Sequence, residues 1–343
     1  MKVLGIESSC DETSAAVIED GTSLLSNVVA TSLDLHAQFG GVVPEIAARS
    51  HIEYITPVIE QALEQAGCDW PDIDAIAVTR GPGLGGSLLV GTLAARTLAT
   101  LKDKPLYGIN HVQAHVAAAF IEPNKPAFPL LALIVSGGHS QLVYFKSFFD
   151  YKLLGQTQDD AVGEAFDKVA KILGLPYPGG PSIGKKALEG NRLAYKFPKA
   201  KLEGKYDFSF SGLKTAVLRA AQRDVGEDYS FPSHKLAERL SEAQKANFAA
   251  SFEHIAIETL LDKLVRATEE YSPASIVIAG GVAANQYLRA VAEKRLSNSV
   301  IYPEFKLCTD NGAMIAAAGY FAHQEKQTTV DPFTLEILPS LSM

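Results

Sequence analysis

The sequence predicts an α/β protein in which one strand-and-helix unit occurs twice. Runs of β-branched and apolar residues alternate along the chain with segments of helical periodicity, which is typical of this fold class. A meander of strands followed by helices begins near residue 3, and a similar pattern begins again near residue 130. The repetition indicates an internal duplication, and we expect a ligand in a central cleft between the two halves.

The first unit is predicted from its apolar runs. The strands VLGIE (3–7) and SAAVIED (14–20) flank the turn SSCDET, and SLLSNVVA (23–30) extends the meander. The following elements are a helix over 44–67, a buried strand over 73–81, a helix rich in small residues over 85–101, a strand over 106–110 and a helix containing HVQAH.

The second unit begins with LLALIVSGGHSQLVYF (130–145), which is strand, glycine turn and strand. The later elements are a strand over 151–157, a helix over 159–174, a strand over 275–281, a helix over 282–296, a strand over 300–304 and a helix over 310–324 with Asp310 as its expected N-cap. Residues 185–235 fit neither unit and are interpreted as an insertion. We therefore expect one lobe from 1–121 plus 315–343, and a second lobe from 122–314 that carries the insertion.

Composition describes a globular protein without membrane spans. The 343 residues are 47% apolar and 20% charged, and the longest uncharged stretch is interrupted by SGGHSQ. The N-terminus has no h-region with a cleavage site, so we do not expect secretion. Three widely spaced cysteines without a CxxC suggest neither disulfides nor a thiolate metal site, which fits a reducing cytoplasm.

The charge is unevenly distributed. The chain carries −8 overall, which by itself argues against a nucleic-acid partner. From Lys185 to Arg223, however, ten Lys and Arg face three Asp and Glu, a net +7 that leaves −15 elsewhere. The aromatic residues between these cations could stack on unpaired bases: Tyr195, Phe197, Tyr206, Phe208 and Phe210. The alternative is a solvated basic surface over a local core.

Two histidines in INHVQAHVAAAFI could bind a metal. His111 and His115 are four residues apart, so on a helix they share one face. Asn110 is a suitable N-cap, and the helix dipole would disfavour imidazolium in the first turns. Asp310 could supply a third, oxygen ligand, giving two nitrogens and one carboxylate with positions left open. Local packing of the histidines and simple capping by Asp310 remain the alternatives.

The two turns between paired strands differ in chemistry. Gly137 and Gly138 allow a sharp turn whose N–H groups could face an anion, with the Ser136 hydroxyl as a further donor. The turn after the first strand instead gathers acids, which repel one another unless water, cations or donors offset the charge: Glu7, Asp11 and Glu12. A glycine hairpin can also be only a hairpin.

Two further segments could contact a nucleoside. Gly280 and Gly281 end a buried strand and open a helix, so that backbone could approach a ligand there, with Asn285 in the next turn. Asp167 could hydrogen-bond a ribose hydroxyl. The alternatives are a plain strand-to-helix connection and a solvated helix acid.

Eight motifs together resemble one enzyme family. GIESSCDET, HVQAH, IVSGGHSQ, GEAFDK, YPGGP, FSFSGLKT, AGGVAAN and CTDNGAMIA occur in the order seen in the tRNA N6-adenosine threonylcarbamoyltransferase family, from about Met1 to Phe321. The resemblance implies two RNase H-like lobes of the actin, sugar kinase and heat-shock chaperone type. It implies transfer of a threonylcarbamoyl group from threonylcarbamoyl-adenylate to the N6 amine of the adenosine 3′ to the anticodon, in tRNAs reading codons that begin with A.

The resemblance also implies site residues. His111, His115 and Asp310 match the metal ligands, with Fe²⁺ expected and Zn²⁺ as the alternative. The positions that hold the adenylate match Ile134, Val135, Ser136, Gly137 and Gly138, together with His139 of the same motif, Asp167, Gly180 and Asn285, beside the pair Gly280 and Gly281. Many bacterial relatives have acids in the loop after PGGP, where this chain has Ser182 and Gly184, so a ribose hydrogen bond from that loop is in doubt.

A mechanism and partners follow from the same resemblance. The metal would polarise the carbamoyl or phosphate oxygens, and the amides of Ser136 to Gly138 would stabilise the departing phosphate. Asp11 or Glu12 would accept the amine proton, with Ser9 of the same turn as a further candidate. The expected partners are tRNA, a catalytically silent paralogue of the TsaB type that forms a heterodimer, and a TsaE-type ATPase through which ATP and Mg²⁺ would act. The helices after PEIAARS and around GGSLLVGTLAA are candidate interfaces.

Three other functions compete with this one. A metalloprotease of the HExxH class needs a glutamate after the first histidine, where this chain has Val112. A non-catalytic ATP-binding scaffold on the same fold would leave the histidine pair unexplained. An O-carbamoyltransferase with the same metal arrangement is the nearer alternative, and it would accept a small hydroxylated substrate instead of tRNA.

Overall fold

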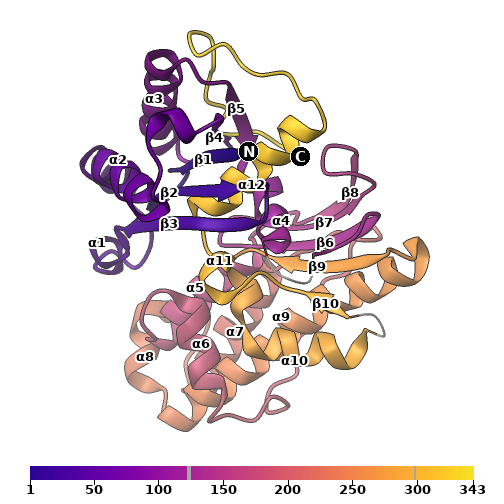
Figure 1. Ribbon diagram of the computed structural model, residues 1–343. Helices are drawn as coiled ribbons and strands as arrows, with labels where there is room; N and C mark the ends of the chain where they lie inside the picture. Colours follow the sequence, from indigo (N-terminus) through magenta and orange to yellow (C-terminus); the bar gives the residue numbers. More distant parts are fainter. Residues whose placement is uncertain (122–124, 297–298) are drawn as a thin grey trace. The chain divides into compact units, whose positions relative to one another are not determined.

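The computed structural model describes residues 1–121, 125–296 and 299–343, which form two compact units (Figure 1). Unit 1 comprises residues 1–127, 146–151 and 301–343, and unit 2 comprises 128–145 and 152–300. Residues 301–314 thus lie in unit 1, whereas the sequence assigned them to the second lobe. They do so because the helix they lead into packs on the first sheet, where the Gly312 amide donates to Ser14 Oγ at 2.7 Å. The expected boundary at residue 122 lies outside the described residues.

Unit 1 is built on a mixed five-stranded sheet in the order β3-β2-β1-β4-β5. Its strands are β1 (Lys2–Glu7), β2 (Glu12–Glu19), β3 (Ser23–Thr31), β4 (Ala75–Gly81) and β5 (Leu106–Asn110). Its helices are α1 (Leu33–Ala37), α2 (Pro44–Ala66), α3 (Gly85–Lys102), α4 (His111–Ala117), α11 (Phe305–Cys308) and α12 (Gly312–Gln324), with 3-10 turns at Trp70–Asp72 and Ala118–Phe120.

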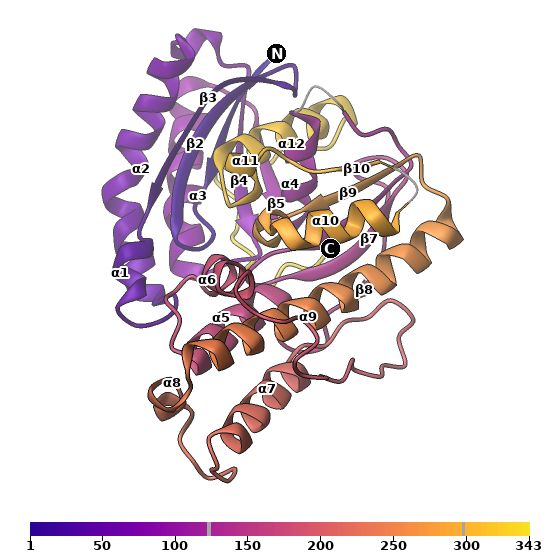
Figure 2. The same ribbon diagram turned by 90° about the horizontal axis from the view of Figure 1, so that it is seen from below.

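Helices cover both faces of this sheet (Figure 2). Side chains alternate between faces along a strand. Ile6 belongs to the apolar cluster under α2 and α3, while Gly5 faces α12 so closely that a Cβ there would meet the Gly312 carbonyl at 2.2 Å. Glycine at residue 5 therefore lets α12 lie directly on β1, and this contact places residue 310 beside the sheet.

Unit 2 repeats the topology with the order β10-β9-β6-β7-β8. Its strands are β6 (Leu130–Val135), β7 (Ser140–Phe145), β8 (Tyr151–Gln156), β9 (Ser275–Ala279) and β10 (Val300–Ile301), of which only Tyr151 and Ile301 belong to unit 1. Its helices are α5 (Val162–Leu173), α6 (Gly179–Ala187), α7 (Ser211–Asp224), α8 (Leu236–Arg239), α9 (Glu242–Tyr271) and α10 (Gln286–Arg295), with 3-10 turns at Ser233–Lys235 and Gly281–Ala284.

The two sheets confirm the predicted duplication. In each unit the first strand pairs antiparallel with the second and parallel with the fourth, as β1 does with β2 and β4, and β6 with β7 and β9. The α/β fold class is therefore confirmed. The 30-residue helix α9 was not predicted, and it packs against α5, α6, α7 and α10.

The insertion differs from its predicted role. Its aromatic side chains pack inward instead of presenting faces to bases: Phe197, Tyr206, Phe208 and Phe210 are buried, and Tyr195 stacks on Phe248 with ring centroids 3.9 Å apart. The expectation that they stack on unpaired bases is wrong, because burying these large rings in the protein core stabilises the fold more than leaving them exposed to solvent. Several of its cations also pair with acids of α9, namely Lys186 with Glu242, Arg192 with Glu253, Lys199 with Asp262 and Lys205 with Glu270.

Two composition-based expectations can be checked on the fold. Among the described residues, Cys10, Cys68 and Cys308 are not joined in disulfides. Within the described ranges, no helix combines the length and the apolar character that crossing a bilayer requires.

Candidate functional site

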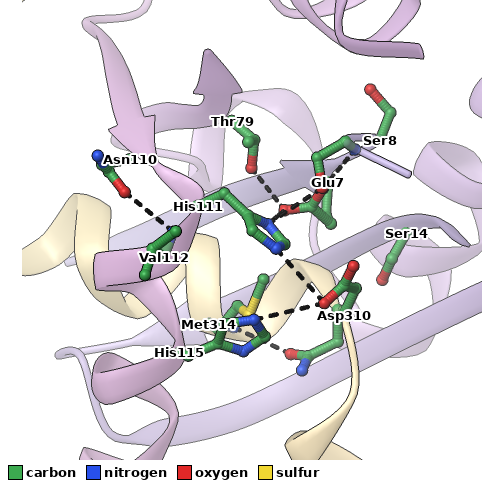
Figure 3. A network of polar contacts seen from close by, with 12 residues as sticks. Glu7, Ser8, Ser14, Thr79, Asn110, His111, Val112, His115, Asp310 and Met314 are labelled. Carbon is green, nitrogen blue, oxygen red and sulfur yellow. Dashed lines mark hydrogen bonds and ion pairs between the residues drawn. The ribbon is translucent and has the colours of Figure 1, made fainter. Parts of the chain in front are cut away.

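The histidine pair of unit 1 lies on the short helix α4, directly after β5 (Figure 3). Asn110 caps this helix as predicted, since its Oδ1 accepts hydrogen bonds from the amides of Val112 at 2.9 Å and Gln113 at 3.2 Å. His111 and His115 are both buried, with ring centroids 4.9 Å apart. The cap fixes the start of the helix, and the helix places both imidazoles on one side.

Asp310 lies against both histidines. Its Oδ1 is 3.6 Å from His111 Nε2 and 3.5 Å from His115 Nε2, and the candidate ligand atoms of the three residues lie within 4.8 Å of one another. The sequence predicted Asp310 as the N-cap of α12, and this prediction is wrong. Asn311 caps the helix, since its Oδ1 accepts a hydrogen bond from the Met314 amide at 3.0 Å. The Asp310 carboxylate is therefore not committed to the helix.

This donor set fits a divalent transition metal. Two buried imidazole nitrogens and one partly exposed carboxylate oxygen converge at one point, which is a common ligand set for Fe²⁺ and Zn²⁺. The spacing of Nε2 and Oδ1 allows one ion to reach all three after small side-chain adjustments. Among the residues that the structure describes, this is the cluster suited to a metal.

Glu7 is a site residue that sequence reasoning did not assign. At the end of β1 its Oε2 lies 3.1 Å from His111 Nδ1 and accepts a 2.6 Å hydrogen bond from the Thr79 hydroxyl. The amide of Ser9 donates to its other oxygen at 2.5 Å. A carboxylate on Nδ1 directs the lone pair of Nε2 toward Asp310, which is how metal-binding histidines are usually oriented. Its complete burial at a strand end is the feature that only the fold reveals.

The carboxylates control protonation at this cluster. Burial alone would raise the pKa of Glu7, but the charge of His111 and hydrogen bonds from His111 and Thr79 lower it to about 2. Burial lowers the pKa of His111, whereas Asp310 and Glu7 raise it, with a net pKa of about 9. Burial raises the pKa of Asp310 to about 6. The expectation that the helix dipole keeps His111 neutral is therefore wrong for the metal-free protein, because two adjacent carboxylates outweigh it.

The acidic turn is held by His51 of α2 and by Ser32, the residue before α1. His51 bonds the Cys10 carbonyl at 2.9 Å and the Thr13 hydroxyl at 2.7 Å, and the Ser32 hydroxyl donates to the Asp11 carbonyl at 3.0 Å. Burial, with Asp310 and Asp11 nearby, raises the pKa of Glu12 well above its usual value. Ser9 Oγ lies 3.1 Å from His111 Nδ1, so Ser9 directly contacts one of the candidate metal ligands.

The glycine turn of unit 2 has a different construction. The Ser136 amide donates to the His139 carbonyl at 2.8 Å, and the His139 amide donates to Ser136 Oγ at 3.2 Å. The Ser136 amide is thus engaged within the turn, which confines the expected anion contact to Gly137 and Gly138. Both are exposed, and a Cβ added at either would meet no described atom within 4 Å.

The other predicted residues of unit 2 divide into accessible and structural positions. Ile134 and Val135 are fully buried in β6, which leaves only their backbone for a ligand. Gly180 and Gly281 have open space where a Cβ would be, with no described atom within 4 Å. Gly280 instead has φ +93°, and a Cβ there would lie 2.4 Å from the Val135 carbonyl oxygen, so the fold itself requires glycine at this position.

Asp167 and Asn285 both make contacts at helix starts. Asp167 Oδ1 accepts from the Gly179 amide at 2.6 Å, at the N-terminus of α6. Asn285 caps α10 through a 2.8 Å hydrogen bond from the Leu288 amide, and its Nδ2 donates to Glu253 Oε1 at 2.9 Å. These contacts orient both side chains, although the sequence assigned them to a ligand.

Comparison with known proteins identifies relatives over nearly the whole chain. Residues 23–317 match the family model described as TsaD, tRNA N6-adenosine threonylcarbamoyltransferase. A protein of that name from Symbiobacterium thermophilum is 51% identical over 322 residues, covering 93% of this chain and 91% of its own. One from Desulfitobacterium hafniense is 47% identical over 349 residues, covering 100% of this chain and 98% of its own.

Solved structures of other proteins share the fold. Component A of (R)-2-hydroxyglutaryl-CoA dehydratase from Acidaminococcus fermentans aligns with a TM-score of 0.51 and 14% identity, covering 93% of this chain and 98% of its own. Full-length HypF aligns with a TM-score of 0.60 and 12% identity, covering 95% of this chain and 56% of its own. At these identities the likeness concerns the fold alone.

Proposed function

The chain belongs to the tRNA N6-adenosine threonylcarbamoyltransferase family, and we propose that its donor substrate is threonylcarbamoyl-adenylate. The acceptor is the N6 amine of adenosine in tRNA, and we assign it to the adenosine 3′ to the anticodon in tRNAs reading codons that begin with A. The convergence of His111, His115 and Asp310 at one point supports this function best, because neither a scaffold nor a plain ATP-binding protein needs it.

His111, His115 and Asp310 would hold one divalent metal, with Fe²⁺ expected and Zn²⁺ as the alternative. When bound, such an ion supplies Lewis acidity for substrate oxygens. Glu7 supports this assignment, since it fixes the orientation of His111 and is itself held by Thr79. The protein's own contribution is a rigid, largely buried set of donors whose tautomers are determined by neighbours.

The transfer requires a proton acceptor and a leaving-group site. The N6 amine forms a bond to the carbamoyl carbon, the bond from that carbon to the phosphate oxygen breaks, and AMP departs. Asp11 or Glu12 would accept the amine proton, with Ser9 as the further candidate in the same turn. Burial, with Asp310 and Asp11 nearby, raises the pKa of Glu12, so that its carboxylate is a stronger base than an exposed glutamate when it is ionised.

Unit 2 would bind the adenylate. The open backbone at Gly137 and Gly138 supports a phosphate contact, since two adjacent amides in a turn attract an anion. Gly180 and Gly281 would let backbone approach the nucleoside, and His139, Asp167 and Asn285 would line the same ligand. Gly280 contributes by shaping the turn after β9 and not through direct contact.

Binding of tRNA would use the cations of the insertion that α9 does not pair. Lys196 and Lys201 are exposed, whereas Lys199 and Lys205 form ion pairs with Asp262 and Glu270. Replacing Lys196 and Lys201 by Gln should weaken tRNA binding and reduce the slope of log K against log salt by about one per lost phosphate contact. The matched control is the pair Lys199→Gln and Lys205→Gln, which should change the slope less. Equal slopes in all variants would contradict this placement.

The partner proteins are proposed to be a TsaB-type paralogue, forming a heterodimer, and a TsaE-type ATPase through which ATP and Mg²⁺ act. Exposed apolar residues on two helices of unit 1 support a protein interface there, namely Ile52 on α2 and Leu89 and Leu93 on α3. Replacing Leu89 and Leu93 by Ser should abolish co-elution with the paralogue, without lowering the melting temperature of the isolated chain.

The decisive experiment is a reconstituted assay. The purified chain with its partners, tRNA, ATP, bicarbonate and labelled threonine should incorporate label into tRNA, and elemental analysis of the same sample should find about one metal per chain. Incorporation into a small hydroxylated acceptor in place of tRNA would support the O-carbamoyltransferase alternative. Absence of both products would support a non-catalytic scaffold.

A further inference from the structure

We propose that Glu253 is a further substrate-binding residue, whose carboxylate accepts a hydrogen bond from a ribose hydroxyl of the adenylate. This inference rests on the proposed nucleotide site of unit 2 and adds a residue that no motif pointed to. Glu253 lies in the middle of α9, far in sequence from the glycine turns, and only 1% of its surface is exposed.

Neighbouring side chains hold the Glu253 carboxylate in place. Oε1 accepts from Asn285 Nδ2 at 2.9 Å, and Oε2 accepts from Arg192 Nη2 at 3.3 Å. Arg192 is itself stacked on Tyr287, with its guanidinium carbon 4.0 Å from the ring centroid. Asn285 cannot turn without losing its cap on α10. The carboxylate is therefore a preorganised acceptor beside a residue already assigned to the ligand.

A face of α6 without side chains lies over this carboxylate. Gly180 and Gly184 are four residues apart, hence one turn apart on the same side of the helix. A Cβ added at Gly184 would lie 3.5 Å from Glu253 Oε1 and 3.8 Å from Asn285 Nδ2, and one added at Gly180 would meet no described atom within 4 Å. Because Gly184 has no side chain, a ligand hydroxyl could approach this part of α6 and the Glu253 Oε1 beside it.

The chemistry of the group selects a hydroxyl. A carboxylate only accepts hydrogen bonds and has about four acceptor positions, of which Asn285 and Arg192 use two. A phosphate would be repelled, whereas the hydroxyls of a ribose can donate. The loop after PGGP offers little instead, because the Ser182 hydroxyl donates to the Gly179 carbonyl at 3.1 Å within α6. Glu253 thus supplies from α9 the acceptor that Ser182 and Gly184 do not.

The test compares AMP with 2′,3′-dideoxy-AMP, which lacks the ribose hydroxyls. Calorimetric titration of the full-length, metal-loaded chain should show AMP binding about ten- to a hundredfold more tightly, as expected for a hydrogen bond to a charged group. In Glu253→Gln this preference should fall to a few-fold, while affinity for the dideoxy compound stays within about threefold. The matched control is Glu258→Gln on the same helix, whose acid pairs with Arg295, and it should keep the full preference.

A second variant covers the case in which Glu253→Gln does not fold. Gly184→Ala adds one methyl at ordinary contact distance from Glu253, so it should fold and yet reduce the preference by filling the hydroxyl's space. An unchanged preference in Glu253→Gln, or in Gly184→Ala if the former is unfolded, would overturn this inference alone. No AMP binding by the unsubstituted protein would instead remove the nucleotide site on which the inference depends.

Discussion

The turn between β1 and β2 and the turn between β6 and β7 occupy the same position in two copies of one topology, yet they share almost no chemistry. In unit 1 the turn is buried and rich in acids, and its backbone carbonyls are bound by His51 and Ser32. In unit 2 the turn is exposed at two glycines. The repeated sheet topology preserves the position of each turn, while the side chains on the two turns differ.

The surroundings of the two turns differ in the same sense. Glu7, at the start of the acidic turn, contacts His111, and His111 in turn lies beside Asp310. Carboxylates and imidazoles therefore form one cluster. The glycine turn packs on the start of α5, where a Cβ at Gly163 would lie 2.5 Å from the Ser136 carbonyl oxygen. The turn in unit 1 thus places carboxylates beside imidazoles, whereas the turn in unit 2 exposes the backbone of two glycines.

Removing a histidine should break the chemistry of unit 1 most severely. His115→Ala should lose bound metal and reduce the rate of single-turnover transfer roughly 10³-fold, because a Lewis-acidic metal lowers the activation free energy by several kcal/mol. Elemental analysis and the labelled-threonine assay measure both effects. His234→Ala, which changes an exposed histidine of unit 2, is the control and should retain both. Full metal occupancy in His115→Ala would remove the ligand assignment.

Neutralising Glu7 should give the next largest effect. Glu7→Gln keeps the size of the side chain but replaces the carboxylate on His111 Nδ1, so metal affinity should fall about 10- to 100-fold. Competition with a metal chelator measures the change. Glu19→Gln at the far end of β2 is the matched control. If both variants bind metal like the unsubstituted protein, Glu7 does not orient His111.

Metal affinity should depend on pH because His111 holds a proton in the metal-free protein. Its pKa of about 9 exceeds the usual value of 6.5, so binding at pH 7 must displace that proton. Affinity should therefore rise about tenfold per pH unit between pH 7 and 9 and level off above pH 9. In Glu7→Gln the plateau should begin at lower pH. A flat profile from pH 7 to 9 would contradict a protonated His111.

The smallest effects distinguish two glycines of unit 2. Gly280→Ala should lower the free energy of unfolding by about 1–3 kcal/mol, because φ is +93° and the Val135 carbonyl is too close. Gly137→Ala should change it by less than about 0.5 kcal/mol but weaken AMP binding. Urea unfolding and calorimetry separate the two outcomes. Equal destabilisation by both substitutions would mean that Gly137 is also structural.

Local patterns were sufficient for most of the strands and helices and for pairing the two candidate histidine ligands. The apolar runs VLGIE and LLALIV predicted β1 and β6, and Asn110 predicted the start of α4, because strand patterns and helix capping depend on neighbours in the chain. The four-residue spacing of His111 and His115 likewise determined that they share a helix face. The family resemblance joined Asp310 to them, and the structure brings the three together.

Tertiary contacts decided what no local pattern contains. The aromatic residues of the insertion became core because α9 provides an apolar surface for them, and α9 also pairs with several of its lysines. Folding buries the carboxylates of Glu7 and Glu253, each beside one partner from a distant segment, His111 and Asn285. The sequence by itself determined most of the strands and helices and the pair of histidines on one helix face. Only the tertiary structure decided which carboxylates lie beside the candidate site residues, since burial and pairing depend on residues distant in the chain.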